Sequence, residues 1–308
     1  MRGSVVLSGG GAFALPQFTQ WEILRTDGEG CDSFQLCFPG DMALFTQLRG
    51  ARHFFAQEQG KRVFTGLVDE MRFALDERGG RVTLDGRGMG ALLLDNQLRE
   101  QEFQTACLED LLKLCTVPFG ISVRGGGLGT LSGFRVDTGD TCRQALWGFV
   151  RHAGGGLPRF DEYGTLLIAQ PGKTVRIQGG AAALKRSRCY CDSLSCVVEV
   201  PARVRGQVQV TQNPAPEALP HQRVTVVSGA KLPASRYTAQ EQIARSERDS
   251  ALLELTLPGS FLASPGDLCQ LALPALGLMG SFLCRSVRSS GGPGGLLCRL
   301  SLEDHKEE

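Results

Sequence analysis

The sequence predicts a mainly β protein with a small α+β lobe, in which two antiparallel β barrels or sandwiches flank a helical or α+β middle domain. Three observations carry this prediction. Alternating apolar and polar residues recur through residues 18–86 and 186–302. The 40 glycines and 14 prolines gather at the turns between these alternating segments. Helical periodicity is concentrated between the two β regions, apart from one short stretch near residue 240.

Composition excludes several classes of protein. Of 308 residues, 42% are hydrophobic and 21% charged, which is enough for a sizeable core. The 33 basic residues are balanced by 32 acidic ones, so the chain lacks the overall positive charge of a nucleic-acid-binding protein. The N-terminus lacks the apolar core of a signal peptide, and no window approaches the roughly 20 apolar residues of a membrane span. The eleven scattered cysteines are expected to be reduced thiols that pack as small apolar residues.

The first β region, residues 1–88, is predicted to form a meander of antiparallel strands with one solvated face. In "SFQLCF" (33–38), Phe34, Leu36 and Phe38 fall on one face of a strand. Turn residues separate the alternating segments. They lie at Pro39-Gly40-Asp41, Gln59-Gly60-Lys61 and Arg78-Gly79-Gly80.

A glycine motif at the end of this region resembles a nucleotide-binding loop. Gly86, Gly88 and Ala91 have the spacing G-x-G-x-x-A. A dinucleotide fold would need a buried parallel strand before the loop, but residues 81–85 are the return arm of a hairpin. It would also need an acidic residue after a second strand about 20 residues on, where this sequence is helical. We therefore expect these glycines to let the backbone turn tightly between a strand and a helix.

The middle segment, residues 89–185, is predicted to be the α+β lobe. One helix is expected over Phe103–Cys115, because Leu108, Leu111, Leu112 and Cys115 share a helical face. A second is expected over Asp140–Ala153, ended by three glycines at 154–156. Two short strands then surround a turn at residues 161–164.

The third segment, residues 186–308, is predicted to be a second β barrel with one surface helix. Strands are expected within 195–210, 222–228, 252–259, 268–274, 281–289 and 296–302. The capping box Thr238-x-x-Glu241 predicts a helix over 238–251. The triplet Pro-Gly-Asp occurs in both β regions, at 39–41 and 265–267, which hints at two related units.

No constellation of catalytic residues is recognisable, so the sequence predicts no catalytic, cofactor-binding or metal-binding residue. His152 falls near a helix end, where its charge suits the helix dipole. Asp161 and Glu162 are adjacent on a turn and do not face each other across a substrate. The loop 122–133 is expected to be a flexible connection rather than an anion site. Packing is favoured for a cysteine cluster whose C-x-C-x4-C spacing lacks the usual zinc knuckle, and whether it binds metal stays open. Its members are Cys189, Cys191 and Cys196.

Three stretches together resemble the baseplate hub proteins of contractile phage tails and phage-derived particles, including those of PBSX-type prophages and phage Mu. The first is residues 60–96, where a strand with "FTGLV" leads through a hairpin to "VTLDGRGMGALLLD". The second is residues 136–168, an amphipathic helix followed by "GGLPRFDEYGTLLI". The third is residues 264–302, beginning "SPGDLCQLALPALGLMGSFL". They occur in the family's order and cover about a third of the chain.

This resemblance implies a structural protein, not an enzyme, that uses no cofactor. It implies two tube-type β barrels per chain and a homotrimer whose ring has pseudo-sixfold symmetry. Such a ring joins the hexameric tail tube to the trimeric spike protein. The implied partners are therefore the tail tube protein, the spike, the tape-measure protein and other baseplate proteins, without membrane binding by the chain itself. The implied location is the baseplate of a virion or tail-like particle made in the bacterial cytoplasm.

Three alternatives stay open at this stage. A tail-associated cell-wall hydrolase would need a Glu/Asp or Cys/His constellation that is not visible. A hub-like part of a secretion-system spike would continue into a repetitive β needle. A carbohydrate-binding β protein would need aromatic platforms, but the chain has only two tryptophans, Trp21 and Trp147, and three tyrosines.

Overall fold

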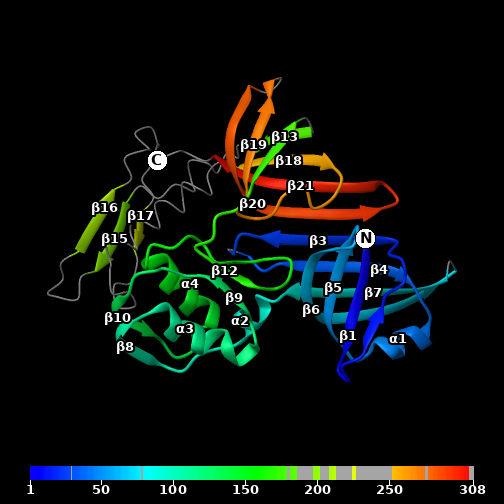
Figure 1. Cartoon of the computed structure of the whole chain (residues 1–308), viewed down its shortest axis with the longest axis horizontal. Coiled ribbons are helices and arrows are strands. Elements are labelled where there is room, and N and C mark those ends of the chain that lie inside the picture. The colour runs from blue at the N-terminus through cyan, green and yellow to red at the C-terminus, as the bar shows by residue number, and fades with distance from the viewer. Residues whose placement is uncertain are drawn as a thin grey trace.

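The structure is a computed structural model, and it shows the mainly β architecture with a small α+β part that the sequence predicts (Figure 1). It describes residues 1–28, 30–77, 79–178, 181–185, 197–201, 208–212, 224–226, 252–274 and 277–304. Figure 1 shows the C-terminal strands β18–β21 above β3, with the other N-terminal strands and helices α2–α4 below them on opposite sides.

The N-terminal strands form one continuous antiparallel run in the order β3-β4-β7-β6-β5-β1-β2. Their bounds are β1 (Arg2–Leu7), β2 (Ala12–Ala14), β3 (Gln20–Thr26), β4 (Ser33–Pro39), β5 (Ala51–Glu58), β6 (Lys61–Asp76) and β7 (Gly79–Gly88). Phe34, Leu36 and Phe38 of β4 are all buried on one face, as predicted, because side chains alternate along a strand. The predicted turn between β5 and β6 is confirmed, with positive φ at Gln59 (49°) and Gly60 (79°).

The triplet at 39–41 does more than turn the chain. Asp41 is the N-cap of a short helix, α1 (Met42–Leu48), and its carboxylate accepts a hydrogen bond of 2.8 Å from the Leu44 amide. This helix was not predicted, because seven residues are too few to show a clear helical period.

The α+β part holds the three helices α2 (Ala91–Asp95), α3 (Leu108–Cys115) and α4 (Cys142–His152) and a 3₁₀ turn, η1 (Val117–Phe119). Its strands are β8 (Gln101–Ala106), β9 (Val123–Gly125), β10 (Leu131–Val136), β11 (Arg159–Phe160) and β12 (Leu166–Ile168). The last two surround the turn at 161–164 as predicted. Their shared core is formed by side chains such as Leu111, Leu146 and Phe149, which are fully buried.

Two expectations for this part were wrong. The first helix begins at Leu108, not at Phe103, because residues 101–106 pair with β10 as strand β8. Cys107 separates the two elements, and its amide donates to Asp110 (3.0 Å) at the start of α3. The loop 122–133 is not only a flexible connection, since β9 pairs with β12 and β10 begins at Leu131. The second helix is confirmed within two residues at its start and ends before Gly154, whose φ is 84°.

The C-terminal strands are β13 (Thr174–Gln178), β14 (Ala181–Lys185), β15 (Val197–Pro201), β16 (Val208–Gln212), β17 (Val224–Val226), β18 (Leu252–Pro258), β19 (Leu268–Leu273), β20 (Leu278–Gly292) and β21 (Gly295–Asp304). β13 and β14 precede residue 186 but pair with β19 and β18. The β13–β19 pair is parallel, so the expectation of a purely antiparallel region was wrong there. Several predictions lie outside the described residues: the helix at 238–251 and the cysteines Cys189, Cys191 and Cys196.

The pairing order of the C-terminal strands repeats that of the N-terminal strands. The order β3-β4-β7-β6-β5-β1 corresponds to β14-β18-β21-β20-β19-β13, and each set also follows the same order along the chain. The one difference is that β1 pairs antiparallel with β5, whereas β13 pairs parallel with β19. The two long strands agree in detail. A bulge lies at Asp69 in β6 and at Arg285 in β20, and residues 70–76 and 286–292 then lead to matching hairpin turns before Gly79 and Gly295.

The pairing register of the two β regions shows that one inference from the sequence was wrong. It places Pro39 opposite Arg81 and Pro258 opposite Leu297, so these two prolines hold equivalent positions. The Pro-Gly-Asp triplets at 39–41 and 265–267 do not. Asp267 lies beside the equivalent of β5, where it accepts hydrogen bonds of 2.8 Å from the Ser264 and Lys173 amides. The shared triplet was therefore no evidence for related units, although the strand pairing is.

Candidate functional site

The two β regions meet where β3 pairs with β20, and this junction makes them one continuous sheet. On the buried face, Trp21 is paired with Gly291, Ile23 with Ser289 and Arg25 with Val287. Trp21 also stacks on Phe261, with ring centroids 5.7 Å apart. The junction therefore has its own packed layer, and the two halves of the chain are expected to unfold together there.

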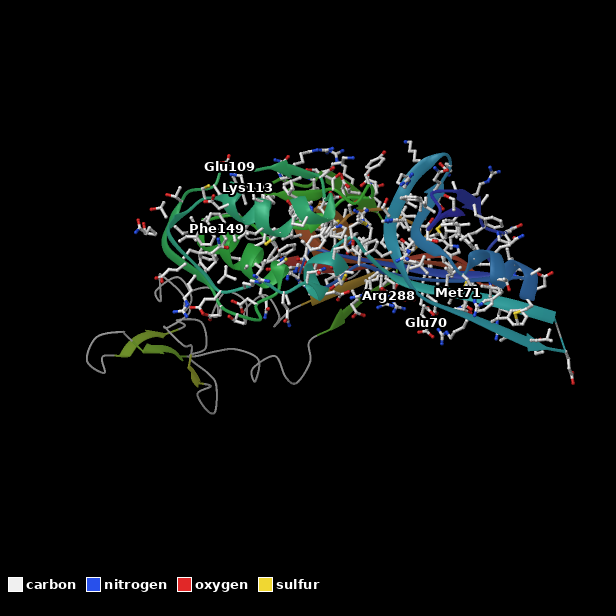
Figure 2. All side chains as sticks on the ribbon, turned by 90° about the horizontal axis from the view of Figure 1, so that it is seen from below. Glu70, Met71, Glu109, Lys113, Phe149 and Arg288 are labelled. Carbon is white, nitrogen blue, oxygen red and sulfur yellow. The ribbon has the colours of Figure 1, made fainter. Side chains whose placement is uncertain are left out.

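The opposite face of this sheet is polar across both β regions. Glu22 of β3 forms an ion pair with Arg288 of β20 across the junction. Further along, Asp85 accepts hydrogen bonds from Gln35 (2.7 Å) and from Arg72. Figure 2 shows Glu70 and Arg288 on the same side of the sheet, away from the body of the protein. A face with charged residues of both signs and few apolar side chains is suited to water rather than to a core.

An unpaired sheet edge runs along the outer half of β6. Residues 70–76 pair with β7 on one side, and within the described part of the chain nothing pairs with their other side. Near the tip of this hairpin, Leu75 is 74% exposed. The equivalent residues of β20, 286–291, are covered by β3. An exposed edge with a large apolar residue invites pairing with another chain.

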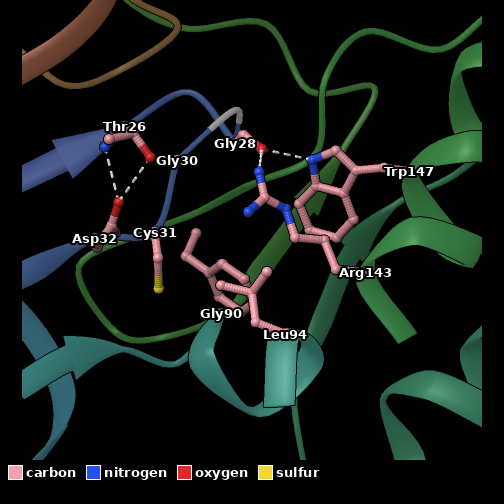
Figure 3. A pocket seen from close by; sticks show the side chains of 10 residues that line it. Thr26, Gly28, Gly30, Cys31, Asp32, Gly90, Leu94, Arg143 and Trp147 are labelled. Carbon is pink, nitrogen blue, oxygen red and sulfur yellow. Dashed lines mark hydrogen bonds between the residues drawn. The ribbon is translucent and has the colours of Figure 1, made fainter. Parts of the chain in front are cut away.

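A small polar cluster joins the loop between β3 and β4 to helix α4 (Figure 3). The Gly28 carbonyl accepts hydrogen bonds from the Trp147 indole (2.8 Å) and from Arg143. In the same loop, Asp32 accepts hydrogen bonds from the Thr26 amide (2.7 Å) and hydroxyl (3.3 Å). Burial raises the pKa of Asp32 to about 6 and that of Cys31 to about 11. The cavity beside them is about 20 Å³, space for one water, so this cluster fixes the loop rather than binding a ligand.

The bulge residues form a matching pair of ion pairs. In β20, Arg285 contacts Glu303 of β21 (3.2 Å) and Asp27 of the β3–β4 loop (2.8 Å), and all three side chains are largely buried. In β6, Asp69 contacts Arg87 of β7 (2.7 Å). Arg87 and Glu303 hold equivalent positions in the repeat, so the two ion pairs correspond with their charges exchanged.

The residues that were singled out in the sequence have structural roles. Gly86 and Gly88 lie within β7, so the expected tight turn was wrong; a Cβ on Gly86 would be 2.5 Å from the Phe34 ring, which explains the glycine. Asp161 accepts from the Tyr163 and Thr165 amides, as a turn residue does. His152 lies in the last turn of α4.

The described residues contain no group of three or more His, Cys, Asp or Glu side chains that could hold a metal ion. Among the helices that the structure describes, none is long and apolar enough to span a membrane. The features that sequence reasoning missed, the β3–β20 junction and the edge of β6, depend on which distant strands pair. The alternation within one strand carries no signal of that choice.

The fold is that of phage tail proteins. The chain superposes on a tail protein of prophage MuSo2 from Shewanella oneidensis with a TM-score of 0.75 at 19% identity, covering 98% of this chain and 97% of that one. A tail protein from Neisseria meningitidis gives 0.76 at 18% identity, covering 98% and 96%. A type VI secretion component from E. coli, described as similar to the T4 tail proteins gp27 and gp5, gives 0.58 at 10%, covering 94% and 74%. No family model and no curated protein matches the sequence.

Proposed function

We propose that this chain is a structural hub protein in the baseplate of a contractile phage tail or tail-like particle. In this proposal, residues 1–88 and 186–308 contribute two tube-type barrels, and residues 89–185 contribute the α+β lobe, with β13 and β14 completing the second barrel. Three chains form a pseudo-sixfold ring that joins the hexameric tail tube to the trimeric spike. The tape-measure protein and other baseplate proteins are further partners, and the chain catalyses no reaction.

The observation that carries this proposal is the internal repeat joined at β3 and β20. One chain supplies two sheets of the same pairing order, side by side and hydrogen-bonded to each other. A ring of three such chains offers six similar wall segments, which is what a threefold-to-sixfold adaptor requires. The tail-protein fold of the similar solved structures supports the same role.

The repeat also indicates which strands would pair between neighbouring chains of the ring. Within the chain, β3 pairs with residues 286–291 of β20. In the repeat, β14 takes the place of β3, and residues 70–76 take the place of the outer half of β20. We therefore expect β14 of one chain to pair with residues 70–76 of the next chain. In the register of the internal junction, Leu75 would then pair with Ala182. This contact would cover the exposed Leu75 and the two edges that have no partner strand among the described residues.

The polar sheet face would line the axial channel. It runs unbroken across the junction, so the ring would present polar side chains such as Glu22, Asp85 and Arg288 all round. A hydrated channel wall with charges of both signs would let a polypeptide pass without binding tightly at any one point. The likeness to the type VI component supports one alternative, a hub-like part of a secretion-system spike. A tail-associated cell-wall hydrolase has no comparable support.

Light scattering on the purified chain and on two variants tests the ring. The wild type at high concentration should have three times the chain mass of 33.1 kDa. Leu75→Asp should give the single-chain mass, because a charge would be buried at the edge of β6. Val117→Asp changes a residue that is 67% exposed on the α+β part and should leave the trimer intact. A trimer in Leu75→Asp would reject the strand assignment, and a wild type that stays monomeric at high concentration would count against the hub.

A further inference from the structure

A basic groove lies where the N-terminal strands, the α+β part and the C-terminal loops meet. Its volume is about 370 Å³. Cationic side chains reach it from β3, β6, β9, β11 and the segment just before β13. They are Arg25, Lys61, Arg62, Arg124, Arg159 and Lys173. Six positive charges face three carboxylates there, Asp161, Glu162 and Asp267, so the groove attracts anions although the whole chain is nearly neutral.

The three carboxylates of the groove are mostly occupied. Asp161 accepts two hydrogen bonds from backbone amides of its own turn. Asp267 accepts from the Ser264 and Lys173 amides, which fixes the loop beside the groove. Glu162 is 3.9 Å from Arg25, too far for a hydrogen bond. With three carboxylates for six cations, the positive charges are only partly compensated.

Arg25 is a buried cation whose hydrogen bonds are weak. Only 6% of the surface of Arg25 is exposed. Its two hydrogen bonds, to the Ser264 hydroxyl and the Phe160 carbonyl, are both long at 3.3 Å, and its Nε has no partner. The Nε of Arg62 also lacks one, and that guanidinium lies over the Phe55 ring at 4.2 Å. Guanidinium groups with buried, unused donors favour a ligand that brings negatively charged acceptors.

We propose that this groove binds an acidic segment of a partner polypeptide through its carboxylates. The walls between the cations are apolar, formed by side chains such as Leu167, Pro171 and Pro265, which suits a peptide that alternates acidic and apolar residues. Nucleic acid fits less well, because bases need exposed aromatic surfaces to stack on. Of the aromatic residues lining the groove, Phe160 is 9% exposed and only Tyr163 is well exposed, at 62%. The inference depends on the groove alone and not on the proposed function.

Fluorescence anisotropy with the full-length chain tests the proposal. The probe is a short dye-labelled peptide of alternating glutamate and leucine, with a peptide of glutamine and leucine as its neutral counterpart. The groove variant is Lys61→Gln with Arg124→Gln; both side chains are exposed, so the fold should persist. The control variant, Arg99→Gln with Lys113→Gln, removes the same charge from exposed positions outside the groove.

The wild type should bind the acidic peptide and not the neutral one, and binding should weaken as salt is raised. The groove variant should bind the acidic peptide about tenfold more weakly, while the control variant stays within about twofold of the wild type. Equal weakening in both variants would overturn the proposal, because attraction would then be general. Tighter binding of a single-stranded oligonucleotide, lost in the groove variant, would also overturn it in favour of nucleic acid.

Discussion

Trp21 of β3 lies directly against the backbone of Gly291 of β20, so that a Cβ on Gly291 would be 2.3 Å from the indole Nε1. The paired positions share one face of the sheet, and the ring occupies the space that any side chain at 291 would need. This glycine is therefore a requirement of the junction between the two β regions and not of a turn.

Gly291→Ala should destabilise the protein by about 2 kcal/mol or more, because the indole or the strand must move to admit a methyl group. Urea unfolding followed by tryptophan fluorescence measures the effect. Gly294→Ala is the matched control, since a Cβ there would meet nothing within 4 Å and its φ is not positive. If both variants unfold at the same urea concentration as the wild type, the packing of Trp21 does not hold the junction together.

Arg285→Met should cost about 3 kcal/mol of unfolding free energy. Without the guanidinium, the largely buried carboxylates of Asp27 and Glu303 would each lose this cationic partner. Arg299→Met, at an exposed position on the neighbouring strand, should change the stability by about 0.5 kcal/mol at most. Thermal denaturation of the two variants separates the loss of this network from the loss of an arginine in general; similar midpoints for both would contradict the role given to Arg285.

The sequence predicted individual elements better than it predicted their partners. Alternation identified Phe34, Leu36 and Phe38 as one buried face, because burial on one side of a strand leaves a local signal. The same reasoning extended a helix over residues 103–106, whose strand character comes from pairing with β10. Local composition does not specify that distant partner.

The candidate site was less accessible to sequence reasoning for the same reason. The internal repeat is visible in how the strands pair and not in which residues they contain. At the equivalent positions Asp69 and Arg285, for example, the charges are opposite. The one repeated motif, Pro-Gly-Asp, falls at positions that do not correspond. Arg25 and Arg62 are far apart in the sequence, so only the fold brings them to one groove.

Trp147→Phe should lower the unfolding free energy by about 1–2 kcal/mol, because the Gly28 carbonyl loses a buried hydrogen bond of 2.8 Å while most of the ring volume is kept. Arg143 still reaches the same carbonyl, which limits the loss. Tyr163→Phe is the control, since this ring is 62% exposed. Limited proteolysis should also cut the β3–β4 loop faster in Trp147→Phe than in the control. Equal cutting rates would show that the indole does not fix this loop.

Asp32 makes the stability depend on pH in an unusual direction. Burial raises the pKa of its carboxyl from 3.8 to about 6, so the folded protein prefers the protonated form. The stabilising contribution of that proton is complete below the unfolded pKa of 3.8 and is lost as the pH rises through about 6.

Asp32→Asn keeps an oxygen that can accept from Thr26 but carries no charge. The unfolding free energy of the wild type should therefore fall relative to that of Asp32→Asn by on the order of 2 kcal/mol between about pH 4 and about pH 7.5. Urea titrations of both proteins across this range measure the difference, and two parallel curves would show that Asp32 is already ionised in the folded protein at acidic pH.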